Sequence, residues 1–337
     1  MKSPVPNPAG ASNAGRCVAR VLAAVVLATA TGSAISQAWP AKPVRLILPY
    51  GPGGGSDVVA RPLAHHLSQR LGQQVLVDNR GGANGNIAME MVARAPADGY
   101  TLVYNDNGHW AINPALHKKL PYDSLRDLAP IGLIAQYTLF LVATASFPAN
   151  TLQELVAAVK ARPDAYTYAS SGIGSPHHLT MEDFKAGLGL KVLHVPYKGS
   201  ALSIPALVGG EVSMAIASLP AVAGFAREGK VKILAANSRN RSVFAPNVPT
   251  MGDAGIAEFD HSGGIGVFAP AGTPRAVIEK LSAALARVVA LPDTVSRFAA
   301  AGLEPITNNT PERLIETVVA DRAKFLRIVK LSGAAPE

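Results

Sequence analysis

The chain carries one local plan twice: a buried strand, a glycine-rich loop, a helix and a second strand. In residues 44–78 the strand VRLILP leads into the loop YGPGGGS, and the helical spacing of DVVARPLAHHLSQRLG leads into the strand QVLVD. In residues 165–195 AYTYAS, SGIGS, PHHLTMEDFKAGLG and KVLHV follow in the same order. The two stretches align without a gap at an offset of 117, which places Gly55 on Gly172. A repeated plan of this kind predicts two similar α/β lobes.

Alternation of strands and helices predicts mostly parallel sheets that are covered on both faces. In such sheets, ligands bind at the carboxyl ends of the strands, beside helix N-termini. We expect further strands at residues 100–104, 139–143, 212–217, 231–236 and 265–269, and helices at 152–161, 201–209, 276–290, 294–301 and 311–331. Crossing strands near residues 139 and 265 predict a discontinuous first lobe, residues 39–140 with 262–337, and a second lobe of residues 141–261.

The first 38 residues are typical of a secretory signal peptide. Three basic residues are the only charges in this segment, an apolar run occupies residues 21–30, and a small-x-small site ends at Ala38. A membrane anchor needs about 20 apolar residues, and this run is shorter. Cleavage after Ala38 removes Cys17, the single cysteine, and lowers the formal charge from +8 to +5. We therefore expect a periplasmic protein without thiol or disulfide chemistry.

Several chemistries compete for the first glycine loop. The dinucleotide fingerprint is partial, because Ser56 stands where its last glycine belongs, and no Gly-Lys-Ser/Thr completes a P-loop. No G-x-S-x-G occurs, and the serines near His178 fit helix capping better than catalysis. The adjacent pairs His65-His66 and His177-His178 point in different directions on a helix, so we expect no metal site. The modest basic excess, without a Lys/Arg run, does not predict nucleic-acid binding.

Anion capture is the chemistry that fits best. A glycine loop that leads into a helix points backbone N–H groups at one spot, where the helix dipole also favours negative charge. Two such loops on facing lobes hold either the two ends of a dicarboxylate or a single carboxylate together, and the sequence leaves both arrangements open. We expect no cofactor, no metal and no enzyme activity.

Seven blocks of sequence, in order, carry a resemblance to a known family. They are WPAKPVRLILPYGPGGGSD, GQQVLVDNRGGANGNIA, ADGYTL, INPALHKKLPYDSLRDLAPIGLI, HVPYKG, NVPTMGDAGI and APAGTP. Together they resemble the Bug-type substrate-binding proteins of tripartite tricarboxylate transporters, which are periplasmic solute receptors. The resemblance implies a two-lobed α/β periplasmic-binding-protein fold (type II-like, Venus flytrap), a small carboxylate held between the lobes, and membrane transporter subunits as partners. We also expect a monomer.

Carried onto this chain, the resemblance implies ligand-binding positions in the two glycine loops and at neighbouring strand ends. They are Tyr50, Gly53, Gly54, Gly55, Ser56, Asp57, Asn105, Asp106, His109, Ser170, Ser171, Gly172, Ser175, His178, Tyr197 and Lys198. Within this set Gly54, Gly55 and Ser56 are expected as donors, and Asp57 as a helix N-cap that fixes the loop. Lys198 is either a cation for the ligand or a solvated surface lysine.

Two features depart from the family pattern. Where the family commonly has a tryptophan before its late glycine-rich strand, this chain has His261, and the stretch YNDNGHW places Asp106 and His109 near the cleft. An acid there opposes a ligand carboxylate or pairs with a ligand amine. The ligand class therefore stays open among dicarboxylates, tricarboxylates, acidic amino acids and aromatic acids such as nicotinate or terephthalate. A sensor component and an exported enzyme remain as alternatives to a transport receptor.

Overall fold

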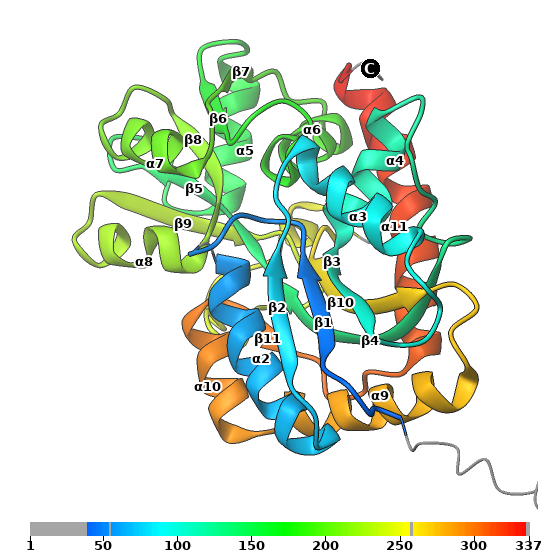
Figure 1. Cartoon of the computed structure of the whole chain (residues 1–337). Helices are drawn as coiled ribbons and strands as arrows, with labels where there is room; N and C mark the ends of the chain where they lie inside the picture. Colours follow the sequence, from blue (N-terminus) through cyan, green and yellow to red (C-terminus); the bar gives the residue numbers. More distant parts are fainter. Residues whose placement is uncertain (1–38, 54, 257–258, 335–337) are drawn as a thin grey trace, which may run out of the picture. The chain divides into compact units, whose positions relative to one another are not determined.

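The computed structural model describes residues 39–53, 55–256 and 259–334 (Figure 1). The chain divides into two units, Met1–Ala41 and Lys42–Glu337, and every element named below belongs to the second. The expected signal peptide, with Cys17, lies outside the described residues, and so does Gly54. No helix in the described ranges has the length and apolar character that crossing a membrane requires.

Six strands form one sheet, in the order β11-β4-β10-β3-β1-β2. Their bounds are β1 Val44–Leu48, β2 Val75–Asn79, β3 Thr101–Asp106, β4 Leu128–Tyr137, β10 Gly263–Pro270 and β11 Leu303–Pro305. One face is covered by α2 (Gly55–Leu71), α9 (Arg275–Val289) and α10 (Pro292–Ala300), and the other by α3 (Asn86–Ala93) and α11 (Pro311–Ser332) (Figure 1). The short helices η1 (Ala83–Gly85), η2 (Gly108–Ile112) and α4 (Asn113–Leu116) follow the ends of β2 and β3. We call this sheet with its helices lobe one.

Five strands form a second sheet, in the order β7-β6-β8-β5-β9. Their bounds are β5 Leu139–Thr144, β6 Thr167–Ser170, β7 Leu193–Pro196, β8 Met214–Ser218 and β9 Val231–Ala236. Helices α5 (Leu152–Ala161) and α6 (Pro176–Leu188) pack on one face, α7 (Ser200–Val208) and α8 (Leu219–Arg227) on the other, and η3 (Met251–Ala254) follows β9. We call this sheet with its helices lobe two.

The central strand β5 shows why lobe two needs helices on both faces. Leu139 and Leu141 enter the core that includes α5 and α6, whereas Phe140 and Val142 enter the core that includes α7 and α8. Side chains alternate between the two faces of a strand, so a run that is apolar at every position must be buried on both sides. All six residues of β5 are buried accordingly.

The expectation of mostly parallel sheets was wrong, because both sheets are mixed. β1 is parallel to β2 and β3, and β6 is parallel to β7 and β8. In contrast, β10 is antiparallel to β3 and β4, β11 to β4, and β5 to β8 and β9. The parallel pairs are joined by helical crossovers within one lobe. β5 and β10 enter their sheets directly from the other lobe, without a helix that returns the chain to the starting edge.

The predicted strands and helices of the middle and end of the chain are confirmed to within two residues of each end. The ranges given above for two domains stay a proposal, which the separate sheets support. The predicted first range ends at residue 140, but Leu139 and Phe140 already belong to β5 of lobe two.

One buried amide, Asn237, ties together the two segments that cross between the lobes. Its backbone N–H donates to the Leu139 carbonyl, and its side-chain oxygen accepts the Leu139 N–H, both at 2.8 Å. Its side-chain nitrogen donates to the His261 carbonyl at 2.9 Å, and its own carbonyl accepts the His261 N–H at 2.7 Å. Asn237 is completely buried, so these bonds supply the hydrogen-bond partners that water cannot supply to the backbone of both crossing segments.

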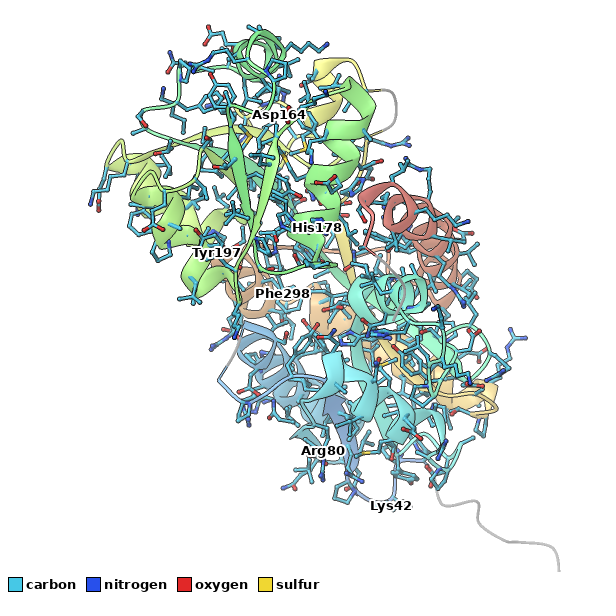
Figure 2. All side chains as sticks on the ribbon, turned by 90° about the horizontal axis from the view of Figure 1, so that it is seen from above. Lys42, Arg80, Asp164, His178, Tyr197 and Phe298 are labelled. Atoms are coloured by element: carbon cyan, nitrogen blue, oxygen red, sulfur yellow. The ribbon has the colours of Figure 1, made fainter. Side chains whose placement is uncertain are left out.

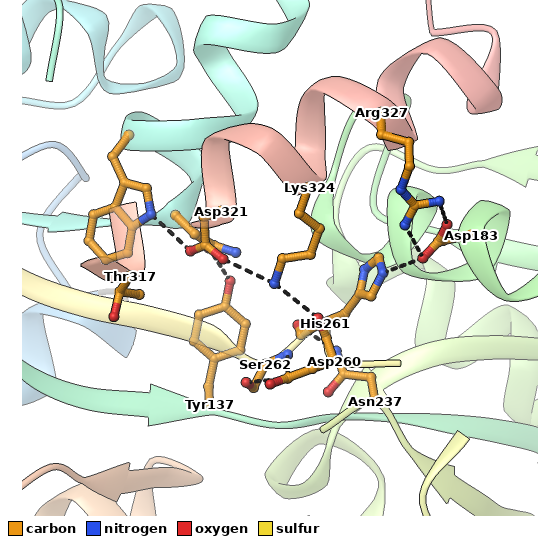
Figure 3. Close-up of polar contacts among 12 residues, drawn as sticks. Tyr137, Asp183, Asn237, Asp260, His261, Ser262, Thr317, Asp321, Lys324 and Arg327 are labelled. Atoms are coloured by element: carbon orange, nitrogen blue, oxygen red, sulfur yellow. Dashed lines mark hydrogen bonds and ion pairs between the residues drawn. The ribbon is translucent and has the colours of Figure 1, made fainter. Parts of the chain in front are cut away.

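His261 and an ion pair add a side-chain network to the same crossing (Figure 3). The His261 ring stacks on Phe259 with centroids 4.6 Å apart, and its Nε2 lies 2.7 Å from an Asp183 carboxylate oxygen. Arg327 of α11 makes two hydrogen bonds to the same carboxylate on α6. Burial opposes ionisation of Asp183, but His261 and Arg327 lower its pKa to about 2. His261 therefore combines a stacking contact with a polar one at this crossing.

Replacing Asn237 with alanine tests its importance. The change leaves the buried Leu139 N–H and His261 carbonyl without their side-chain partner, and each unpaired group costs about 1–3 kcal/mol. We expect the free energy of unfolding in urea to fall by about 2–6 kcal/mol. Asn240→Ala, at an exposed position three residues along, is the control and should change it by less than about 0.5 kcal/mol. Equal losses in both variants would contradict the role given to Asn237.

Candidate ligand-binding site

A cavity of about 470 Å³ lies where loops of lobe one meet the loop that follows β6 of lobe two. Residues 49–51 and the loop after β2 form one part of its wall, η2 and α4 form the next, and residues 171–176 close it from lobe two. The volume is in the range that small-molecule sites occupy. Strand ends and helix N-termini converge here, which agrees with the position expected for a ligand in an α/β sheet.

Asp106 and its partners form the floor beneath lobe one's side of the cavity. Tyr50 donates its hydroxyl to one oxygen of the Asp106 carboxylate, and the Gly108 N–H donates to the other at 2.9 Å. That second oxygen also lies 3.0 Å from Nδ1 of His109, at ion-pair distance. Burial alone raises the pKa of Asp106, but His109, Tyr50 and Gly108 together lower it. Asp106 is therefore held ionised, with both oxygens in use.

Gly85 fits against His109 so closely that no side chain can replace its hydrogen. A Cβ at Gly85 would lie 2.2 Å from His109 Nε2 and 2.9 Å from the Pro49 side chain, and its φ of +81° also favours glycine. Asn113 fixes the same loop by donating to the Asn84 carbonyl at 3.0 Å, and Tyr122 donates to the His109 carbonyl at 2.8 Å. The loop after β2 and helix η2 thus form one rigid wall.

The loop of lobe two is fixed from behind by two histidines. His178 Nδ1 accepts the Gly174 N–H at 3.1 Å, and His194 Nε2 lies 2.7 Å from the Ser170 hydroxyl, which in turn accepts the Gly172 N–H. The rings of His178 and His194 are stacked with centroids 4.3 Å apart. Ser175 caps α6, because its side chain accepts the His178 N–H. In the view of Figure 2, His178 lies nearer the cyan elements of lobe one than Asp164 does.

The structure places the expected site residues in two groups. Tyr50, His109, Ser171, Gly172 and Ser175 line the cavity. The other described positions of the expected set do not line it: Gly53, Gly55, Ser56, Asp57, Asn105, Asp106, Ser170, His178, Tyr197 and Lys198.

Internal partners hold several members of the second group. Asp57 accepts the Gly53 N–H and pairs with Arg61, so it fixes the loop. The expectation that it is the N-cap was wrong, because α2 already begins at Gly55 and Asp57 lies in its first turn. Ser170 and His178 support the lobe-two loop, as described above. Asn105 is fully buried, and its amide has no hydrogen-bond partner among the described residues. Lys198 is exposed, in agreement with the solvated alternative.

Sequence reasoning missed most of the wall that lobe one provides. The residues missed outright are Pro49, Gly81, Gly82, Asn84, Gly85, Ile112, Asn113 and Leu116, with Pro176 in lobe two. Gly51, Gly108, Ile173 and Gly174 lie in segments that the sequence placed at the site without naming them as contacts. A signal was present, because RGGANG directly follows a strand and is rich in residues that adopt positive φ. Gly82, Ala83, Asn84 and Gly85 all have positive φ.

Two mixed α/β lobes with a cavity at their facing loops define a periplasmic solute-binding fold, and comparison with known proteins agrees. The family model for the tripartite tricarboxylate transporter family receptor, TctC, matches residues 59–332. The chain belongs to this family, whose receptors are periplasmic binding proteins. BugT of Bordetella pertussis is 35% identical over 320 residues, covering 94% of this chain and 98% of BugT.

Two solved structures are similar over almost their whole length. The R. palustris protein Rpa4515, solved with adipate, has 33% sequence identity and a TM-score of 0.74, covering 89% of this chain and all of its own. MatC from Rhodopseudomonas palustris, solved with bound malate, has 30% identity and a TM-score of 0.70, covering 86% of this chain and all of its own. The expected family and two-lobed fold are confirmed.

Partly buried histidines beside the lobe-two loop predict that stability depends on pH. Burial lowers the pKa of both His177 and His194 to about 4, whereas an unfolded histidine titrates near about 6.5. The unfolded chain therefore binds more protons between these values, and stability falls as the pH falls through this window. We expect the free energy of unfolding to drop by on the order of 1–3 kcal/mol from about pH 7.5 to about pH 5, after allowing for partial exposure.

Substitutions test whether these two histidines, and not other groups in the chain, cause the pH dependence of stability. His194→Gln, which keeps a polar partner for Ser170, should flatten the pH dependence measured by urea unfolding. His65→Gln, on the exposed side of α2, should leave the dependence unchanged. The same slope in the wild type and in a His177→Gln, His194→Gln double variant would rule out this origin.

Proposed function

We propose that this protein captures a small carboxylate in the periplasm, between its two lobes, and delivers it to the membrane subunits of a tripartite tricarboxylate-type transporter. The proposal includes export with removal of residues 1–38 and action as a monomer. Tyr50, His109, Ser171, Gly172 and Ser175 are the expected site residues that we propose as ligand contacts, because they line the cavity.

The observation that carries the proposal is a set of unused donors in the cavity wall. The N–H groups of Gly51, Gly81 and Gly82 have no hydrogen-bond acceptor among the described residues, yet all three residues line the cavity. Successive N–H groups on a loop of positive φ form a concave anion site. His109 lines the same wall, and its Nε2 has no partner among the described residues. A carboxylate satisfies donors of this kind without any metal or cofactor.

The similar structures support the ligand class. Adipate and malate, named for two structures of the same fold, are both small carboxylates. These proteins share about a third of their residues with this chain over nearly its whole length, which supports the same broad class of ligand here.

A catalytic alternative is disfavoured by the geometry of the serines. Ser171 lies 2.8 Å from Nδ1 of His177, which resembles the contact between a nucleophile and its base. Burial lowers the pKa of His177 to about 4, which makes it a weak base near neutral pH. No carboxylate is hydrogen-bonded to its other nitrogen in the described part of the chain. A turnover assay on whichever carboxylate binds is the direct test.

Disrupting the gene distinguishes a receptor that delivers its ligand for uptake from one that presents its ligand to a sensor. If the receptor serves uptake, disrupting its gene should abolish transport of the bound carboxylate. Loss of gene induction with uptake intact would instead identify a sensor.

A loop variant tests whether the lobe-one glycines hold the carboxylate. Gly82 has a φ of +120°, so Gly82→Val strains the loop and moves its N–H groups. A hydrogen bond to a charged group contributes about 1.5–3 kcal/mol, so losing one should weaken binding about tenfold to a hundredfold. Ligands come from a thermal-shift screen of carboxylates, in which one at about 100 times its Kd adds about 2.7 kcal/mol of stability.

The control places the same valine at a glycine of positive φ that lies away from the cavity. Gly229 also has positive φ, with open space around it, and Gly229→Val should leave affinity unchanged in calorimetry. If a folded Gly82→Val protein kept wild-type affinity, the loop after β2 would not contribute to ligand binding. A screen in which neutral sugars, and no carboxylates, shift the melting temperature would refute carboxylate capture itself.

A further inference from the structure

We infer that His178 is a positioning residue for ligand capture, whose neutral ring holds the lobe-two loop in the shape that offers donors to the ligand. Proton uptake by the ring releases the loop. This inference rests on the proposed function and deepens it, because it adds a control over binding. Acid weakens binding through a group of the protein, separately from any titration of the ligand's own carboxylate.

The backbone N–H groups of the lobe-two loop divide into two sets. Those of Gly172 and Gly174 donate to side chains behind the loop, the second of them to His178 Nδ1, each at 3.1 Å. Those of Ser171 and Ile173 have no acceptor among the described residues, and both residues line the cavity. The two held groups therefore fix the loop in a shape that leaves the other two available to an anion.

The contact with Gly174 determines which protonation state of His178 holds the loop. A backbone N–H can only donate, so Nδ1 must carry a lone pair and the neutral ring must carry its proton on Nε2. A second proton, on Nδ1, turns this acceptor into a donor and sets two N–H groups against each other. The loop must then move at Gly174, which lines the cavity and packs against Leu116 of lobe one.

The neighbouring histidines do not share this property. Nδ1 of His177 lies 2.8 Å from the Ser171 hydroxyl, and Nε2 of His194 lies 2.7 Å from the Ser170 hydroxyl. A hydroxyl both donates and accepts, so each of these contacts survives a proton on the histidine. His178 is therefore the member of this group whose charge decides whether the loop is held.

The position of His178 favours its neutral ring. The side chain is buried in the first turn of α6, where the helix dipole opposes a positive charge. Its ring stacks on His194 of β7 with centroids 4.3 Å apart, and His194 stacks in turn on Tyr168 of β6 at 4.7 Å. A charge on one of the two stacked histidines opposes a charge on the other.

Two charged side chains of α6 act on the same ring. Burial lowers the pKa of His178, Glu182 opposes this shift and Lys185 adds to it. One oxygen of Glu182 accepts both the Tyr168 hydroxyl and the Lys185 ammonium, so this carboxylate is already paired. His178 therefore takes up a proton below the usual histidine value of about 6.5, and a fall in pH through that range favours the released loop.

The first test uses the purified protein without any ligand. Nitrogen-15 NMR at about pH 7.5 should show a neutral His178 ring with its proton on Nε2, and on lowering the pH to about 4.5 the ring and the Gly174 amide should titrate with one midpoint. A proton on Nδ1 at the higher pH would overturn the inference. So would a Gly174 amide that stays unchanged while the ring titrates, or a ring that stays neutral until the chain unfolds.

Two substitutions at His178 separate the acceptor from the proton. His178→Asn keeps an acceptor oxygen near the position of Nδ1 but takes up no proton in this range, whereas His178→Leu removes the acceptor. At about pH 7.5 we expect the leucine variant to bind about fivefold more weakly than the asparagine variant, the effect of one hydrogen bond. Malate is the first probe in calorimetry, and the carboxylate with the largest shift in the thermal screen replaces it if malate does not bind.

The pH dependence of Kd then isolates the ring from the probe. Titration of the probe's own carboxylates is common to all variants, so only the excess change in the wild type reports on His178. From about pH 7.5 to about pH 4.5 we expect the wild-type Kd to rise at least about threefold more than that of His178→Asn. His65→Asn, at an exposed position on α2, is the matched control and should keep the wild-type change.

The outcomes separate this inference from the function beneath it. Equal pH dependence in the wild type and in His178→Asn would overturn the inference and leave carboxylate capture standing. Equal affinity of the asparagine and leucine variants would do the same, because the acceptor would then not position the loop. If no carboxylate binds in the screen, the proposed function fails, and the role of His178 in capture fails with it.

Discussion

The structure depends on how one chain is shared between two sheets, and Asn237 is where that sharing is fixed. Its four hydrogen bonds connect the start of β5 with the segment that leads into β10. A short, fully buried amide satisfies both crossing backbones where no third strand is present to do so. Because the crossings are held together, the loop after β6 faces the loops after β1 and β2, and a cavity forms between them.

Glycine has two distinct uses in this chain. At Gly85 and Gly174 a side chain would collide with His109 or Leu116, and positive φ adds strain, so space and conformation both require glycine. At Gly189 the added Cβ meets nothing within 4 Å, and the residue serves only as the left-handed cap of α6. The requirement for glycine at Gly85 and Gly174 therefore comes from what lies against them, which is a property of the fold rather than of local sequence.

Local patterns predicted much of the fold, and long-range contacts explain what they missed. The alternating plan gave the α/β class, two lobes and most elements, because periodicity and turn residues act over a few positions. Strand β4 was not predicted because Pro130 and Gly132 interrupt its run of strand-forming residues. Pro130 lies beside an irregularity in the pairing with β10, and Gly132 is required by close approach of the Asn309 carbonyl. In the candidate site, the sequence located the loops but not which N–H groups remain free, because His178 and His194 decide that.

The cavity wall and the whole chain differ in charge, and this difference separates how an anion approaches the protein from how it binds. The chain has a formal charge of +8, or +5 without residues 1–38, yet no Lys or Arg lines the cavity in its described part, and Lys198 lies exposed outside it. A positive surface raises the local concentration of anions in general, and salt screens this effect. Fixed N–H groups in the cavity wall act at short range, where the geometry of an anion decides how many hydrogen bonds it accepts. Under the proposed function, positive charge on the outside speeds encounter with anions, while hydrogen bonds in the cavity decide which anion stays.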